Sequence, residues 1–319
     1  MTTFKEIRGT TIEVVSSDPS NPELGQIWYN SSSGTLKGSQ YVAAWSAGGN
    51  LNTARGRLAG AGTQTATLAF GGQPSPTGAT ELYNGTSWTS NPTGLNTARF
   101  GLAGAGSQTS SLAFGGYTGT ANTGATESFN GSTWTSVNSM NTARIYLSGC
   151  GTQTAALAAG GSAPSISGQT ESWNGSSWTS VTSMNTARSY MAGCGTNTAS
   201  LFFGGETAPG TQTESWNGSS WTTVNSLNTG RGNMGAAGTQ TLAICMGGSP
   251  PGDGITATEL WNGTSWTTNP NSLATARARG PLGAGTQAAA IIAGGFNPSA
   301  TSATEEWNLG GATKTITVS

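Results

Sequence analysis

The sequence predicts an all-β fold made of many short strands, and three observations support this expectation. The chain has 319 residues with 50 Gly and 12 Pro, too many for long helices because Gly costs roughly 1 kcal/mol relative to Ala inside a helix. It carries 11 Trp and a formal net charge of −1, whereas disordered chains combine high net charge with few aromatic residues. A pattern of about 44 residues also recurs along the chain.

The charge and composition argue against several classes of function. The 12 basic residues are scattered singly and form no basic patch, so we expect no nucleic-acid partner. No apolar run is long enough for a membrane span, and Met1–Ser20 lacks the apolar core of a secretory signal. With no His and no C-x-x-C pair, we expect neither metal nor cofactor, and we interpret Cys150, Cys194 and Cys245 as buried small residues.

The repeat has six copies, and each copy carries the same landmarks in the same order. An Asn-Thr-Ala-Arg tetrad or a close variant ends at Arg55, Arg99, Arg144, Arg188, Arg231 and Arg277. A Gly-Gly pair begins 16 or 17 residues after each Arg. A Glu-x-aromatic triplet follows, with Glu81, Glu127, Glu171, Glu214, Glu259 and Glu305. In the first five copies an Asn-Gly pair and a second Trp come next.

Each copy predicts four short strands. The first is a strand of small residues after the Arg, such as Gly101–Gly106 or Tyr146–Gly151. A Gly-Thr-Gln-Thr turn leads into an apolar strand that stops at Gly-Gly, such as Thr67–Phe70 or Leu201–Phe203. The Glu-x-aromatic triplet lies on the third strand. Asn-Gly predicts a type I′ hairpin turn into a fourth strand with the second Trp, as in Ser177–Val181.

Four antiparallel strands repeated around an axis predict a β-propeller with six blades. Small residues suit the crowded strand nearest the axis, and the aromatic residues would pack one blade on the next. The last copy lacks its second Trp, while the strand around Trp45 precedes the first Arg, so the N-terminal strand can complete the last blade and close the ring. Alternatively, Thr313–Val318 forms that last strand, which frees the N-terminal hairpin for a seventh blade or for an external attachment.

The order of Arg, small strand, apolar strand with Gly-Gly, Glu-x-aromatic and Trp resembles the kelch repeat over residues 41–308. It departs from that repeat in its Asn-Gly hairpins, its Thr- and Ser-rich turns and its low charge. Residues 25–37 resemble hairpin segments of tail-fibre and other virion proteins of bacteriophages, and the array is similar to kelch arrays in proteins carried by marine phages. The resemblance implies an attachment segment over 1–40, with a hairpin at 25–37, and a kelch-type β-propeller over 41–319.

One Arg and one Glu in every copy predict a repeated structural ion pair rather than a catalytic group. The alternative is a ring of six arginines that binds an anion at the pore. We interpret the paired aromatic residues as the core between blades, with carbohydrate platforms as the alternative. The Asn-Gly-Ser/Thr sequons are interpreted as hairpin turns rather than as glycosylation sites.

Sequence variation is concentrated on one predicted face. The loops after Gly-Gly and the corners at Asn-Thr-Ala-Arg share this face, because connections in an up-and-down blade alternate between the two faces. The second residue after each register Arg also varies there, and loops on a rigid scaffold are the usual place for recognition. The alternative is that these loops vary because nothing constrains them. The candidate ligand-binding residues are Tyr117, Tyr146, Tyr190, Glu206, Asp253 and Phe296.

Three functions compete at this point. The first is a non-enzymatic structural and binding component of a bacteriophage virion, present in many copies on the particle surface. Residues 1–40 would bind other virion proteins, and the propeller would face a host glycan, a host protein or neighbouring subunits. The second is an enzyme: kelch-type copper oxidases need the missing His, whereas a glycosidase would rely on Glu206 and Asp253. The third is a cellular kelch adaptor that binds a protein partner, which the charge-poor sequence disfavours.

Overall fold

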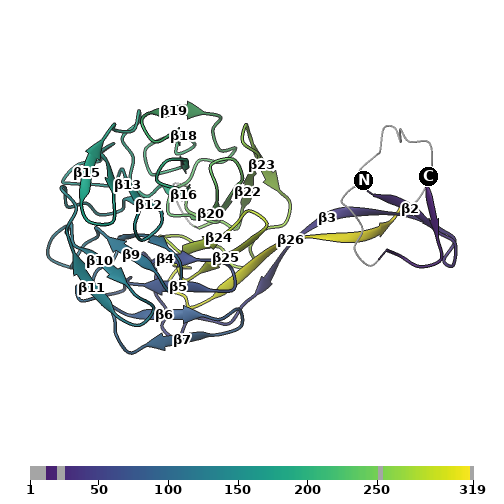
Figure 1. Cartoon of the computed structure of the whole chain (residues 1–319), viewed down its shortest axis with the longest axis horizontal. Coiled ribbons are helices and arrows are strands. Elements are labelled where there is room, and N and C mark those ends of the chain that lie inside the picture. Colours follow the sequence, from purple (N-terminus) through teal and green to yellow (C-terminus); the bar gives the residue numbers. More distant parts are fainter. Residues whose placement is uncertain (1–11, 20–25, 251–253, 317–319) are drawn as a thin grey trace. The chain divides into compact units, whose positions relative to one another are not determined.

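The computed structural model describes residues 12–19, 26–250 and 254–316 (Figure 1). Every regular element in these residues is a β-strand, and the strands form six hydrogen-bonded sheets. Five of the sheets are four-stranded and antiparallel, with strands in sequence order. The predicted all-β class and the four strands per copy are therefore confirmed, and the repeated sheets are consistent with a β-propeller.

The strands of the six copies recur at equivalent positions. First strands are β4 (Ala59–Gly62), β8 (Ala103–Gly106), β12 (Ser148–Gly151), β16 (Ala192–Gly195), β20 (Gly235–Gly238) and β24 (Leu282–Gly285). Second strands are β5 (Thr67–Phe70), β9 (Ser111–Phe114), β13 (Ala156–Ala159), β17 (Ser200–Phe203), β21 (Ala243–Met246) and β25 (Ala289–Ala293). Third strands are β6 (Thr80–Tyr83), β10 (Thr126–Phe129), β14 (Thr170–Trp173), β18 (Thr213–Trp216), β22 (Thr258–Trp261) and β26 (Thr304–Thr315). Fourth strands are β7 (Trp88–Asn91), β11 (Trp134–Val137), β15 (Trp178–Val181), β19 (Trp221–Val224) and β23 (Trp266–Asn269).

The sixth sheet obtains its fourth strand from the other end of the chain. Here β26 lies between β25 and β3 (Thr35–Ala47), so the strand around Trp45 occupies the position that β7 to β23 occupy in the other sheets. The alternative fourth strand, Thr313–Val318, is not formed in the described residues, because its first residues continue β26 as far as Thr315. Residues that belong to the third strand cannot also form the fourth strand beside it.

The chain divides into two compact units. One is Trp45–Trp307, and the other combines Met1–Ala44 with Asn308–Ser319. The sequence analysis drew its boundary at residues 40 and 41 and left the C-terminal residues with the repeats. The division instead groups these C-terminal residues with the N-terminal ones, and Ile316 N–H donates to the Leu36 carbonyl at 2.8 Å.

The first strands lie nearest the centre of the repeat unit and the fourth strands at its rim, as β12, β16 and β20 against β11, β15 and β19 show (Figure 1). All side chains of the second strands are buried, apart from the first residue of β25, whereas in the fourth strands only the leading Trp is buried. This gradient follows the sequence, because the second strands are apolar and the fourth strands are Thr- and Ser-rich after their Trp.

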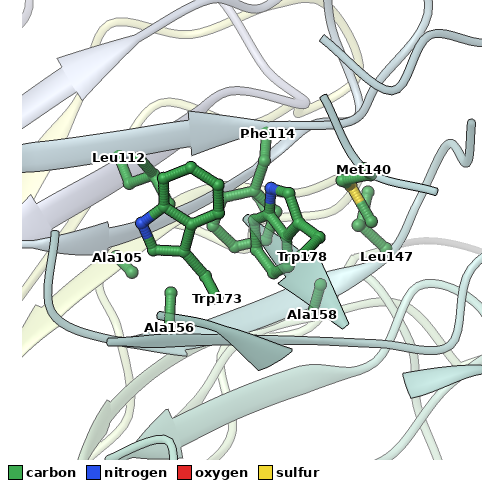
Figure 2. Packing of buried hydrophobic residues seen from close by; sticks show 10 residues of the cluster. Ala105, Leu112, Phe114, Met140, Leu147, Ala156, Ala158, Trp173 and Trp178 are labelled. Atoms are coloured by element: carbon green, nitrogen blue, oxygen red, sulfur yellow. The ribbon is translucent and has the colours of Figure 1, made fainter. Parts of the chain in front are cut away.

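Aromatic side chains fill the space between adjacent sheets (Figure 2). Trp173 and Trp178 lie opposite each other on β14 and β15, and the Trp178 ring packs 4.9 Å from Phe114 of the preceding sheet. Both indoles are at most 5% exposed, which is too little for a carbohydrate platform. Four further clusters repeat this packing. The interpretation as core between sheets describes these aromatic residues, with each ring pair worth about 0.5–1.5 kcal/mol beyond its burial.

The Gly-Gly pairs allow close contact between successive copies. Gly115 has φ of 69°, and a Cβ there would lie 2.8 Å from Leu147 Cδ2 and 2.9 Å from the Arg144 carbonyl oxygen. Gly116 N–H donates to the same Arg144 carbonyl at 2.8 Å. The apolar strand therefore stops at a position where the corner of the next copy packs directly on backbone.

Two local predictions were wrong in detail. The first strands begin at Ala103 and Ser148, two residues later than expected, because Gly101 and Tyr146 adopt left-handed conformations with φ of 61° and 58°. Extended pairing cannot pass through a residue in that conformation.

The Asn-Gly connections are four-residue loops rather than two-residue type I′ turns. In the third copy, Asn174 Oδ1 accepts hydrogen bonds from Ser176 N–H and Ser177 N–H at 2.9 and 2.8 Å. Only Gly175 of this loop has positive φ, at 93°. The Asn side chain thus supplies the turn by bonding its own backbone, as it does in the other loops at Asn84, Asn130, Asn217 and Asn262.

In the N-terminal unit, β2 (Ile27–Asn30) forms an antiparallel hairpin with β3, within the predicted hairpin at 25–37. β1 (Glu13–Val15) pairs parallel to β2. Asp18 organises this unit: it accepts hydrogen bonds from Trp28, Asn30 and Lys37 at 3.1, 2.7 and 2.7 Å. These donors lower the pKa of Asp18 from 3.8 to about 2, with Lys37 as the largest cause.

Candidate functional site

The register arginines and glutamates form six ion pairs, one in each copy. Their N–O distances lie between 2.5 and 3.0 Å, and the Arg side chains are at most 1% exposed. The pairs are Arg55–Glu81, Arg99–Glu127, Arg144–Glu171, Arg188–Glu214, Arg231–Glu259 and Arg277–Glu305. Burial lowers the pKa of five of these arginines, and the partner carboxylate opposes that effect.

Each pair also holds the corner that joins two copies. Arg144 Nη1 donates to the carbonyls of Gly160 and Gln169 at 2.7 and 2.6 Å. Glu171 Oε2 accepts from Asn141 N–H at 2.7 Å while its Oε1 accepts from Arg144. Protein groups therefore compensate both charges, although Arg144 Nε is buried without a hydrogen-bond partner. These contacts account for the repetition of Asn, Arg and Glu at fixed spacing.

Sequence reasoning missed the role of Gln in the Gly-Thr-Gln-Thr turns. Gln153 Nε2 donates to the carbonyls of Ser111 and Phe129 in the preceding sheet, at 3.1 and 2.5 Å. Equivalent bonds come from Gln64, Gln108, Gln240 and Gln287. The fourth copy has Asn197 instead, which is one methylene shorter. The recurrence of one residue type in an exposed turn was the signal that could have identified this contact between sheets.

The first strands surround two central cavities that share Gly60, Gly104, Gly149, Gly193, Ala236 and Gly283. The larger cavity is about 140 Å³ and is lined by the residues at which the first strands begin. The smaller is about 110 Å³ and is lined by Gly, Ala and two Cys side chains. None of the six register arginines lines either cavity in the described residues, so the alternative of a register-arginine ring at the pore does not describe their position.

The mouth of the larger cavity is a closed circle of backbone hydrogen bonds. In the first five copies its member is the second residue after the register Arg, whereas in the sixth copy Gly280 donates and Arg279 accepts. Each donor N–H bonds to a carbonyl of the preceding copy. The bonds are Gly101 to Arg57, Tyr146 to Gly101, Tyr190 to Tyr146, Asn233 to Tyr190, Gly280 to Asn233 and Arg57 to Arg279, at 2.8 to 3.3 Å. Arg57, Tyr146, Tyr190, Asn233 and Arg279 are the five non-glycine residues with positive φ in the described chain. Strained backbone of this kind is often found at binding sites.

Arg57, Tyr146 and Tyr190 form a column across the mouth. Arg57 Nη1 donates to Tyr146 Oη at 2.8 Å, and its guanidinium lies 5.0 Å from the centre of the Tyr146 ring. Tyr146 and Tyr190 stack with centroids 3.9 Å apart. Gly101 separates Arg57 from Tyr146 in the circle, and its missing side chain leaves room for this contact, because a Cβ there would lie 2.9 Å from Tyr146 Cδ1.

Asn233 and Glu206 lie on the other side of Tyr190. The Asn233 side chain donates to Glu206 Oε1 at 2.9 Å, with Asn233 buried and Glu206 exposed. Burial raises the pKa of Tyr190, and the neighbouring Tyr146 and Glu206 raise it further. The Tyr190 hydroxyl therefore keeps its proton throughout the neutral range.

The remaining candidate residues are less closely associated. Tyr117 packs against Phe100 at 5.5 Å, and Phe100 in turn lies 5.8 Å from the Arg57 guanidinium. Phe296 lies 5.6 Å from the Arg279 guanidinium. Asp253 is outside the described residues. The structure thus brings Tyr146, Tyr190 and Glu206 together and leaves Tyr117 and Phe296 at the periphery.

Arg57, Asn233 and Arg279 belong to the mouth but were not among the candidates from the sequence. Their position was recognised there as variable, yet aromatic and acidic residues were chosen over them. The signal that could have selected them is charge: Arg57 and Arg279 are the described arginines that lie outside the repeated Arg-Glu pairs.

Within the described ranges, no three His, Cys, Asp or Glu side chains gather as metal ligands. Cys150, Cys194 and Cys245 are buried free thiols, and burial raises the pKa of Cys150 to about 12. The same ranges contain no helix of a length and apolarity that would cross a membrane.

The sequence was also compared with known proteins. No protein-family model matches the chain, and no curated protein matches it.

Proposed function

We propose that residues 45–307 form a six-bladed β-propeller of the kelch type, closed by the strand around Trp45. In four other junctions the leading Trp of a fourth strand donates its indole N–H to a Thr hydroxyl of the preceding sheet, as Trp266 does to Thr213 at 3.1 Å. Trp45 makes the same bond to Thr258 at 3.1 Å, and Trp88 makes it to Thr304 at 3.0 Å. First strands are neighbours in turn, including β24 and β4, and both observations support a closed ring.

We propose further that the protein is a non-enzymatic structural and binding component of a bacteriophage virion, exposed on the particle surface. The observation that carries this proposal is the contrast within each copy: the ion pairs repeat without change, whereas the mouth residues differ from copy to copy. A rigid scaffold with one individual face is typical of recognition proteins. The virion assignment rests on the resemblance of residues 25–37 and of the repeat array to phage proteins.

In this proposal the N-terminal unit attaches the protein to other virion proteins, and the propeller displays the mouth face to a host surface. The N-terminal unit supports such a role because Val14 and Tyr29, which are paired in register, are 66% and 39% exposed. Solvent-exposed apolar side chains beside each other are typical of contact surfaces.

Mass spectrometry of purified phage particles tests the virion assignment. We expect peptides of this chain in the particles, at a ratio to the capsid protein that indicates several copies. Recovery only in host lysate, bound to a cellular protein, would instead support the kelch adaptor. A competition assay tests the recognition role: purified protein should reduce adsorption of the virions to host cells, and unchanged adsorption would count against it.

A further inference from the structure

We infer that the mouth of the central cavity binds one terminal sugar residue that carries a carboxylate, with Arg57 as the anion-binding group. This inference rests on the proposal that the mouth face is a recognition surface, and it adds the chemical class of the ligand. Four features of the mouth support it: its size, its unpaired charge, its polar groups and its prearranged geometry.

The size of the cavity selects a single ring. Its volume of about 140 Å³ is close to that of an engineered cavity of about 150 Å³ that takes up benzene. One six-membered ring therefore fits, whereas several rings of a polymer exceed this volume. The ligand is accordingly the terminal residue of a glycan.

The charge of the mouth selects an anion. Eight arginines lie in the described residues, and six of them are paired with glutamates. Arg57 and Arg279 have no carboxylate partner in those residues, and of the two only Arg57 lines the cavity, whereas the Arg279 guanidinium lies over Phe296. A charge-assisted hydrogen bond from a guanidinium to a carboxylate is stronger than a hydrogen bond between neutral groups.

Arg57 is held ready for such a ligand. Its Nη1 donates to Tyr146 Oη at 2.8 Å and to Gln73 Oε1 at 3.4 Å, which fixes the plane of the guanidinium. Its Nη2 has no hydrogen-bond partner in the described residues and is not a buried atom, so it remains available. A prearranged donor loses little conformational entropy on binding.

The opposite side of the mouth suits hydroxyl groups. Asn233 lines the cavity, and Glu206, which does not, holds the Asn233 side chain in place by accepting from its amide at Oε1. Asn233 contributes a carbonyl oxygen of its own, since its amide nitrogen is the donor to Glu206. A ligand with a carboxylate at one side and hydroxyl groups at the other is a uronic acid or a related acidic sugar, rather than a simple anion.

The experiment measures binding of glucuronate, glucose and acetate to the full chain by ligand-observed NMR titration. We expect glucuronate to bind, and both glucose and acetate to bind at least tenfold more weakly. Glucose lacks the carboxylate, and acetate lacks the sugar ring with its hydroxyl groups. Equal binding of glucose would overturn the role of Arg57, and equal binding of acetate would overturn the need for a sugar ring.

The variants Arg57→Gln and Tyr190→Phe test the residues. Loss of a charge-assisted hydrogen bond predicts at least about a tenfold weaker affinity for glucuronate in Arg57→Gln. Tyr117→Phe is the matched control for Tyr190→Phe, because Tyr117 lies on the same face but does not line the cavity, and it should bind as the unaltered protein does. Melting temperatures of all three variants exclude unfolding as the cause, and unchanged affinity in a folded Arg57→Gln would refute the site.

The outcome is distinguishable from failure of the proposed function. If the protein is found in virions and competes for adsorption while glucuronate does not bind, the ligand class is wrong and the recognition role stands. If the protein is absent from virions, the virion assignment fails whatever the titration gives.

Discussion

Two sets of positions, two residues apart in the repeat, differ in burial and in sequence. The register arginines are buried, identical in all six copies and paired with glutamate, whereas the second position after them holds Arg57, Gly101, Tyr146, Tyr190, Asn233 and Arg279. The first set sits where each side chain has neighbours on every side, and the second set sits where side chains face an open cavity. The closely packed positions therefore carry the same residue in every copy, whereas the positions with access to solvent differ between copies.

Removal of a register arginine should have the largest effect on stability. Arg144→Ala removes the cationic partner of the buried Glu171 carboxylate and the side-chain donor to the carbonyls of Gly160 and Gln169. Breaking a buried pair in this way costs about 3–5 kcal/mol. Chemical denaturation followed by Trp fluorescence measures it.

The mouth provides the contrast to this variant. Arg57→Ala should cost less than about 1 kcal/mol, because Arg57 is half-buried and has no carboxylate partner. Equal losses for Arg144→Ala and Arg57→Ala would remove the distinction between the two sets.

Alteration of a Gly-Gly pair should have the next largest effect. Gly115→Ala places a methyl group within 3 Å of Leu147 and of the Arg144 carbonyl, at a φ of 69°. The strain predicts a loss of about 1–3 kcal/mol. Gly310→Ala is the control, since a Cβ at Gly310 meets nothing within 4 Å, and comparable melting temperatures for the two would contradict the packing argument.

The Gln contacts between blades allow a test in both directions. Gln153→Ala leaves the Ser111 and Phe129 carbonyls without a donor, for an expected loss of about 1–2 kcal/mol. Asn197→Gln restores in the fourth copy the side chain that the other five have, with an expected gain of about 0.5–1 kcal/mol. Denaturation midpoints measure both, and destabilisation by Asn197→Gln would show that the fourth junction is built differently.

The smallest effect is expected in the N-terminal unit at low pH. The pKa of Asp18 is depressed to about 2, so its contribution to stability is present above pH 4 and is lost as the pH falls from about 4 to 2. The indole N–H of Trp28, which donates to Asp18, reports this by NMR. Lys37→Met should move the transition to higher pH, and an unchanged midpoint would exclude Lys37 as the main cause.

Much of the fold could be predicted from the sequence, because each landmark repeats six times. The strands, the Arg-Glu register and the position of the strand around Trp45 follow from spacing alone. The start of the first strands and the form of the Asn-Gly loops did not, because both depend on a backbone conformation that a residue name only permits. Tyr146 occupies a left-handed conformation for which its side chain gives no signal.

The candidate site was less predictable than the fold. Variation indicated the face on which the mouth lies, and Tyr146, Tyr190 and Glu206 lie together there. Arg57 and Asn233 were missed because their importance depends on which neighbours they lack or contact across copies. Tyr146 is 89 residues from Arg57 in sequence, and no local pattern relates the two.

The backbone circle at the mouth has a consequence for how such a protein diversifies. Because main-chain hydrogen bonds hold the six positions, a side-chain substitution at one of them leaves the backbone of the other five in place. Each position of the mouth can therefore be substituted independently. The set of tolerated residues is restricted, because a left-handed backbone conformation is least favourable for β-branched residues. The residues at the six positions are Arg, Gly, Tyr, Tyr, Asn and Arg. We expect related chains that bind other ligands to carry different residues at these positions, but not Val, Ile or Thr.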